Sequence, residues 1–190
     1  MTRRAPALAP EDRRAALVEV TLPLVLEHGR AVTTAQIAEA AGVAQGTIFR
    51  VFATKEELVE EAIDSAFDMD AYIRAVEALQ PRRTLDETVT ELAQLMIQRF
   101  SQVFAVISIA GHKKSPPRQN AEDWVRRIST AHTRLLEPFA DELTLPPGEV
   151  MRFVRLLAFS GSNPHITEGN LLTAAEISAI VLDGSRRKGP

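Results

Sequence analysis

Apolar residues recur along this chain at intervals of three and four positions, which is the spacing of one face of an α-helix. Sustained alternation of apolar and polar residues, which would indicate half-buried strands, is nearly absent. The pattern therefore predicts an all-α protein, with helices over residues 11–28, 34–41, 45–52, 55–79, 85–107, 121–136, 149–160 and 174–182.

The longest predicted helix follows Thr54, which together with Glu57 has the form of a capping box. Its apolar positions keep to one face as far as Leu79, and Pro81 ends it. At about 1.5 Å per residue this helix, over residues 55–79, would span roughly 37 Å. We therefore expect one continuous helix to link the N-terminal part of the chain to the rest.

Two short helices precede the long one. Thr33 and Gln36 form another candidate capping box, so the first short helix begins at residue 34. Gly42 suits the left-handed conformation that ends a helix, and the next short helix covers residues 45–52. Two short helices joined by a tight turn that contains glycine are typical of a helix-turn-helix, which we place at residues 33–52.

A resemblance to the DNA-binding segment of the TetR-type family of transcriptional repressors covers Thr33 to Leu58, TTAQIAEAAGVAQGTIFRVFATKEEL. The positions that match the family's pattern, without gaps, are Ile37, Ala38, Ala41, Gly42, Val43, Gly46, Thr47, Phe52, Lys55 and Leu58. The resemblance implies a three-helix DNA-binding head over residues 1–54, joined by the long helix to a helical ligand-binding and dimerisation domain over residues 55–184. We expect residues 185–190 to be a disordered tail.

The same resemblance implies a function: a homodimer that binds a pseudo-palindromic double-stranded DNA operator, represses transcription and is released by a small apolar effector. It places the DNA contacts on Thr34, Gln45, Gly46, Thr47, Arg50 and Lys55. Phe49 and Val51 replace tyrosines that are common in the family, and Ala44 stands where a hydroxyl residue usually caps the recognition helix. From their reach and donors, we expect Gln45 and Arg50 to read base edges, and Thr34, Thr47 and Lys55 to hold phosphates.

Gly46 lies in the predicted recognition helix, where glycine costs about 1 kcal/mol relative to alanine. A helix that keeps this glycine either lets its backbone approach a partner such as DNA or packs closely against another part of the chain. For the segment as a whole, the alternative is a helical hairpin that binds no DNA.

Charge argues mildly against a nucleic-acid partner, because the net charge is −3 and the isoelectric point about 5.9. A small DNA-reading head needs only a local basic face, and its candidates are Arg3, Arg4, Arg13, Arg14, Arg50 and Lys55. The chain has no cysteine, which excludes disulfides and thiolate metal sites. We find no signal peptide and no run of membrane-spanning length, so we expect a soluble cytoplasmic protein.

Large or flexible apolar residues on the C-terminal helices are candidates for an effector pocket, or else form plain core. The residues that we assign to ligand binding are Phe67, Tyr72, Met96, Phe100, Phe104, Trp124, Ile128, His132 and Phe153, with Gln98 as a further polar handle. The last two helices also carry more apolar surface than a terminal pair can bury alone, which favours dimerisation over closure of the monomer core. The residues that we assign to the dimer are Met151, Val154, Leu157, Phe159, Ile177, Ile180 and Val181.

The rival function classes are an enzyme and a helical adaptor that works through protein contacts alone. The four histidines, His28, His112, His132 and His165, are scattered, and no glycine-rich loop precedes a helix. We therefore expect no catalytic site, no metal site and no cofactor. The acidic cluster Glu56, Glu57, Glu60 and Glu61 is explained by the helix dipole and a solvated face. An adaptor would leave the helix-turn-helix pattern without a purpose.

Overall fold

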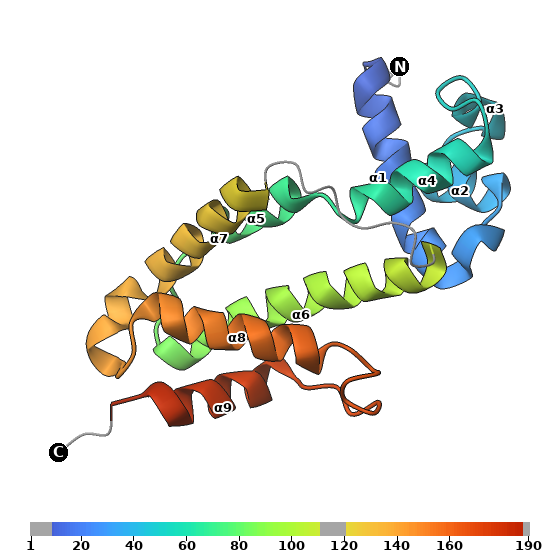
Figure 1. Cartoon of the computed structure of the whole chain (residues 1–190). Coiled ribbons are helices and arrows are strands. Elements are labelled where there is room, and N and C mark those ends of the chain that lie inside the picture. Colours follow the sequence, from blue (N-terminus) through green and yellow to red (C-terminus); the bar gives the residue numbers. More distant parts are fainter. Residues whose placement is uncertain (1–8, 111–120, 188–190) are drawn as a thin grey trace. The chain divides into compact units, whose positions relative to one another are not determined.

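The computed structural model describes residues 9–110 and 121–187, and the elements in these ranges are helices (Figure 1). The described residues contain one isolated β-bridge, between Leu143 and Arg186, and no longer strand. The predicted all-α class is therefore confirmed. The expectations for Arg3, Arg4 and His112 lie outside the described residues.

Contacts within the chain group it into two compact units, Met1–Phe67 with Ala105–Ser115 and Asp68–Phe104 with Pro116–Pro190. The helices that begin in the first unit are α1 (Pro10–His28), α2 (Thr34–Ala41), α3 (Gln45–Ile48) and α4 (Lys55–Ser65), coloured blue to teal in Figure 1. Those that begin in the second are α5 (Met69–Ala78), α6 (Leu85–Ala110), α7 (Ala121–Leu136), α8 (Pro147–Gly161) and α9 (Ala174–Ser185). Short 3₁₀ segments cover Gly29–Ala31 and Glu137–Glu142.

The first unit is a small helical head in which α1 packs against α2 and α4, and α2 packs against α3. Its core side chains, all fully or almost fully buried, are Leu17, Val25, Val32, Ile37, Ile48, Phe52, Leu58, Ala62 and Ile63. The capping box predicted at Thr33 is confirmed, because Thr33 and Gln36 each accept a hydrogen bond from the other's backbone N–H. Gly42 ends α2 in the left-handed conformation, with φ 65° and ψ 31°, as predicted.

The single long helix predicted over residues 55–79 is wrong, because α4 ends at Ser65 and α5 begins at Met69. The backbone N–H groups of Ala66 and Phe67 turn back to Ile63 and Asp64, in the tighter three-residue pattern. Asp68 then caps a new helix, since its side chain accepts a hydrogen bond from the Asp70 N–H at 2.8 Å. This cap favours the start of a new helix over continuation of α4. The apolar periodicity of the sequence therefore continues although the helix is interrupted.

The second unit is built around α6 to α9. α5 packs against α7, α7 against α8, and α8 against α9. Their buried apolar side chains form one cluster that includes Val89, Leu92, Met96, Leu135, Leu136, Val150, Met151, Val154, Ile177, Val181 and Leu182.

The predicted disordered tail begins with residues that the structure holds in place. Ser185 is buried at the end of α9, and its carbonyl accepts a hydrogen bond from the Thr144 N–H at 2.7 Å. The Arg187 N–H donates to the Glu142 carbonyl at 2.8 Å. The expectation of disorder is therefore wrong for residues 185–187, and the last three residues lie outside the described part of the chain.

One described helix, α6, is long and apolar enough to cross a membrane by length and composition, over Leu85–Ile109 with a mean hydropathy of 1.3. The expectation that no run reaches this length is therefore wrong. A core helix of a soluble protein meets the same criterion, and α6 supplies Val89, Leu92 and Met96 to the core of the second unit.

His132 is a polar residue inside this apolar core. Its side chain is 4% exposed, and its Nε2 atom is buried without a hydrogen-bond partner among the described residues. The ring of Tyr72 meets it edge-on, with 6.5 Å between ring centroids. Burial, together with the positive charge of Arg155, lowers the pKa of His132 from 6.5 to about 4. The imidazole is therefore neutral at pH 7.

We predict that the second unit loses stability as the pH falls from about 6.5 to about 4. In this window the unfolded chain binds a proton at His132 that the folded chain refuses, so protons favour unfolding. At about 1.4 kcal/mol per pKa unit, the full effect is about 3 kcal/mol. Urea unfolding followed by the fluorescence of the single tryptophan, Trp124 on α7, measures it.

His132→Phe should flatten this part of the pH profile, whereas His165→Gln, at an exposed loop histidine, should leave it unchanged. Carboxylates titrate near the same pH in every variant, so the difference between variants isolates His132. Equal slopes for the wild type and His132→Phe would contradict the assignment.

Candidate nucleic-acid interface

The recognition helix of the helix-turn-helix is α3, and it is shorter than the sequence predicts. It spans Gln45–Ile48 instead of residues 45–52. Ala44 provides no side-chain cap, and beyond Ile48 the Arg50 and Val51 N–H groups bond three residues back instead of four. The backbone therefore tightens into a turn, although Phe52 still bonds to the Ile48 carbonyl at 2.9 Å.

One side chain anchors α3 to the head. Ile48 is 0% exposed, and Phe52, at the end of the following turn, is 1% exposed. Because successive helical residues are about 100° apart, burial of Ile48 turns Gly46, Phe49 and Arg50 outward. All three are exposed, as is Gln45 beside them.

Of the residues that the sequence assigns to DNA contact, four lie on α3 or in the turn after it, while Thr34 begins α2 and Lys55 begins α4. Gln45, Gly46 and Arg50 are exposed, while Thr34 and Thr47 are partly buried. Within residues 9–110 and 121–187, no hydrogen bond or ion pair engages the side chain of Arg50. All these positions remain predictions as DNA contacts, and the exposure of Gln45, Gly46 and Arg50 is what such a role requires.

Gly46 is not explained by packing inside the chain. A Cβ atom added there would meet no heavy atom within 4 Å. Close packing against another part of the described chain, the alternative offered by the sequence, is thus removed. The space beside the Gly46 backbone is therefore open to an external partner.

Arg14 on α1 holds the end of the recognition segment. Its guanidinium donates to the Val51 carbonyl at 3.1 Å and to Glu57 at 3.0 Å, and it forms a bidentate pair with Glu61. It also lies over the ring of Phe52, 4.2 Å from the centroid. We call this set of contacts the Arg14 clamp. It joins α1, α4 and the turn after α3.

The clamp keeps its charges paired. Hydrogen bonds from Arg14 and from the Ala53 N–H lower the pKa of Glu57, and hydrogen bonds to Glu61 and Glu57 raise the pKa of Arg14. The bond from Ala53 also explains why the second capping box is incomplete: Thr54 accepts from the Glu57 N–H, but the Glu57 carboxylate turns to Ala53.

The local basic face expected from the sequence does not form as a set. Arg14 is committed to the clamp, and Arg13 also has a partner within the chain. Lys55 donates to the Arg30 carbonyl at 3.2 Å. Among the described candidates, Arg50 is the cation with no such commitment. The sequence missed the clamp because its partners lie 37 to 47 residues from Arg14, beyond any local pattern.

The predicted effector residues do not gather around one hollow. Met96 lies in the core of the second unit with Tyr72 and Phe100 packed against it, whereas Phe67 belongs to the first unit. Trp124 and Ile128 are partly buried on α7, and Phe153 is 39% exposed. Phe100 and Phe104 instead pack edge-on against Phe159, with centroids 5.3 and 5.2 Å apart.

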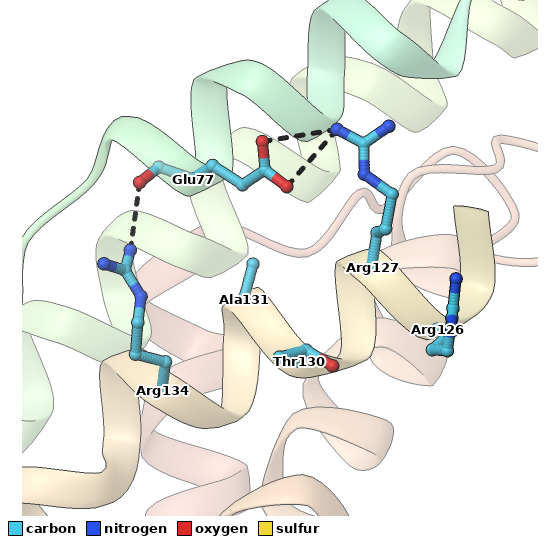
Figure 2. A pocket seen from close by; sticks show the side chains of 6 residues that line it. All are labelled: Glu77, Arg126, Arg127, Thr130, Ala131 and Arg134. Atoms are coloured by element: carbon cyan, nitrogen blue, oxygen red, sulfur yellow. Dashed lines mark hydrogen bonds and ion pairs between the residues drawn. The ribbon is translucent and has the colours of Figure 1, made fainter. Parts of the chain in front are cut away.

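Two hollows of the described chain lie elsewhere, along α7, and mostly polar side chains line them. The larger, of about 450 Å³, is shown in Figure 2. There Arg127 pairs with both oxygens of Glu77 at 3.3 Å, and Arg134 donates to the Glu77 carbonyl at 3.0 Å. These arginines fasten α7 to α5, and the hollow beside them is open to solvent.

The residues assigned to dimerisation divide into two groups. Met151, Val154, Ile177 and Val181 are buried in the core of the second unit, with 0 to 6% exposure. Leu157 is partly buried against that core. Phe159 and Ile180 are exposed by 44% and 53%, and Phe153 and Leu156 on α8 are exposed as well.

We predict that Arg14→Gln lowers the melting temperature of the head and weakens DNA binding. The substitution removes the bond to the Val51 carbonyl and leaves Glu57 and Glu61 facing each other without a cation. Arg30→Gln is the matched control, since Arg30 pairs with the single carboxylate Glu60 at an exposed site. Circular dichroism and fluorescence anisotropy with a labelled duplex measure both effects. Equal losses in the two variants would refute the special role of Arg14.

Comparison with known proteins agrees with the geometry of the head. The family model described as bacterial regulatory proteins, tetR family, matches residues 17–62, which include the helix-turn-helix and the buried residues that support it. The predicted resemblance is therefore confirmed on this segment.

Solved structures share the fold over nearly the whole chain. A TetR transcriptional regulator from Streptomyces coelicolor is 20% identical, with 93% of this chain and 99% of that chain covered and a TM-score of 0.55. A regulator of the TetR/AcrR family from Thermobifida fusca is 21% identical, with coverages of 93% and 100% and a TM-score of 0.53. The complex of SmeT with triclosan is 16% identical, with coverages of 94% and 93% and a TM-score of 0.52.

The family match covers residues 17–62, and the solved structures, at 16 to 21% identity, show that the fold is shared. The chain is therefore similar to bacterial regulatory proteins of the tetR family over residues 17–62, and it shares the fold of TetR-type regulators.

Proposed function

We propose that the protein is a dimeric repressor that binds a palindromic operator and is released by a small, largely apolar effector. The observation that carries the proposal is α3, which is anchored by Ile48 and turns Gly46, Phe49 and Arg50 to solvent. A regulator of this kind acts on bacterial DNA, so we assign it to the cytoplasm.

Side-chain chemistry supports a division of labour on this face. Arg50 and Gln45 carry the paired donors and acceptors that recognise guanine and adenine in the major groove. Thr34, Thr47 and Lys55 suit phosphate contacts, which fix the register of the head on the duplex. To bind a phosphate, Lys55 would have to give up its hydrogen bond to the Arg30 carbonyl. The loss of this bond would offset part of the binding free energy gained from the phosphate.

The exposed apolar surface of α8 and α9 supports dimerisation. Phe153, Leu156 and Phe159 on α8 and Ile180 on α9 are each between 39% and 53% exposed. A second copy that covers this surface would bury apolar groups that one chain leaves in water. The interface that we propose therefore uses the exposed members of the predicted set, because the buried members already serve the core.

A small-molecule effector is supported by a solved complex that shares the fold and by a buried polar group of the second unit. A solved complex of SmeT, which shares the fold, contains triclosan, a small aromatic molecule. His132 has a buried nitrogen with no hydrogen-bond partner among the described residues, and it lies beside Tyr72. Partial burial raises the pKa of the Tyr72 hydroxyl to about 12, so this group stays protonated. Titration of the protein–DNA complex with aromatic compounds, together with melting temperatures of the same samples, tests this part.

Release would not pass through one continuous helix, since α4 and α5 are separate. A change in the tilt of α5 would have to be transmitted to the head through the non-helical residues between α4 and α5 or through another connection. A differential affinity of about 1–3 kcal/mol between the two states would change DNA affinity by about 5- to 150-fold.

We predict that the wild type selects a palindrome from a random duplex library, with half-sites about 34–36 Å apart or a small multiple of that distance. On that operator, Arg50→Ala should cost about 1–3 kcal/mol and relax base preference. Lys55→Ala should weaken all sequences alike and lower the salt slope by about one unit. Arg126→Ala, at an exposed arginine of α7 that pairs with Asp123, is the control. Failure to bind any DNA would favour the adaptor.

We predict a mass in solution of twice the chain mass of 20.9 kDa, measured by light scattering at micromolar concentration. Leu156→Glu and Ile180→Glu should shift the protein toward monomer, because each places a charge within the proposed apolar interface. Val125→Glu changes an equally exposed apolar residue on α7 and should leave the dimer intact. A wild type of single-chain mass, or dimers that persist in both variants, would rule out this interface.

A further inference from the structure

Phe49 is an aromatic residue on the outward face of α3 that the assigned DNA contacts do not include. Its side chain is 52% exposed, although a phenyl ring normally gains by burial. It closes α3 as the C-cap residue with φ −73° and ψ −5°, so the helical direction of its side chain is kept. A large apolar group is therefore held in water next to Arg50, the base-reading candidate.

The neighbours of Phe49 on α3 leave its ring accessible. Gly46 lies one turn earlier on the same face, and a Cβ atom added there would meet nothing within 4 Å. Ile48 is buried on the opposite side and fixes the rotation of the helix. The face thus presents a bare backbone at Gly46, a ring at Phe49 and a guanidinium at Arg50. A duplex can approach the bare backbone until the ring reaches the base edges.

The chemistry of the major groove limits what such a ring can recognise. Base edges there present hydrogen-bond donors and acceptors, and their one apolar group is the 5-methyl group of thymine. Phe49 has no hydroxyl with which to hold a phosphate, so its contribution has to be apolar. We infer that Phe49 is a specificity-determining residue that packs against a thymine methyl group in each operator half-site. This inference rests on the proposed DNA binding through α3.

The probe for this inference is the palindromic duplex selected by the wild-type protein, in which thymines are replaced by deoxyuridine one symmetric pair at a time. Deoxyuridine removes only the methyl group and keeps base pairing. At one pair of positions we expect the wild type to lose about fourfold in affinity for each methyl group, or about 15-fold for the pair. The other replacements should change affinity little.

The matched variants complete a double-mutant cycle. Phe49→Ala should bind the thymine and deoxyuridine duplexes equally, and Phe49→Leu should keep part of the difference, because leucine can still contact the methyl group. Val125→Ala removes an exposed apolar side chain on α7 and should behave like the wild type. Melting temperatures show that each variant is folded. Because Phe49 is exposed, its replacement should disturb the fold little.

A second modification tests the methyl group in another base. Placing cytosine at the sensitive position should weaken binding, and 5-methylcytosine should restore the part of affinity that depends on Phe49. If Phe49→Ala weakens every duplex alike and no thymine is sensitive, the ring contacts the sugar–phosphate backbone and the inference is overturned. If the wild type binds no duplex at all, the proposed function itself fails, so the two failures are distinguishable.

Discussion

The proposed DNA-binding face depends on the attachment of α3, a helix too short to be stable by itself. α3 has four residues, far fewer than the twelve or so that an isolated helix needs to be even marginally stable in water. Its orientation therefore comes from tertiary contacts, namely burial of Ile48 and Phe52 and the bond from Arg14 to the Val51 carbonyl. Because the same guanidinium binds Glu57 and Glu61 on α4, the position of the face is tied to the packing of α1 and α4.

The clamp also explains how an acidic protein can carry a DNA-binding head. Glu57 and Glu61 lie close to the recognition segment and would repel phosphates if they were unpaired. Arg14 offsets one of these two negative charges, and in doing so it withdraws its own charge from the outward face of α3. The net contribution of Arg14 to attraction is thus small, and Arg50 is left as the principal charge on the outward face. Specificity then depends more on shape and apolar contact than on a dense basic surface.

Local chemistry decides which features could be predicted from the sequence. The capping box at Thr33 and the left-handed Gly42 depend on residues within four positions of each other, and both are found as predicted. The continuous helix over residues 55–79 fails because apolar periodicity reports which face is buried, whereas the break is made by a single cap at Asp68. Burial of Met151, Val154, Ile177 and Val181 in one chain could not be separated from burial between chains, since both produce the same apolar pattern. The Arg14 clamp joins distant segments and leaves no local trace.

The two units balance polar groups in different ways, and this difference bears on regulation. In the head, the clamp carboxylates are matched with Arg14, so the recognition segment is held by satisfied contacts. In the second unit, the Nε2 atom of His132 is buried and finds no partner among the described residues, which costs free energy that a bound molecule with a suitable hydrogen-bonding group would recover. A ligand that repays this cost stabilises the conformation in which it binds. Any effect on DNA then requires that conformation to differ between the DNA-bound and free protein, because a ligand shifts an equilibrium only by its differential affinity for the two states.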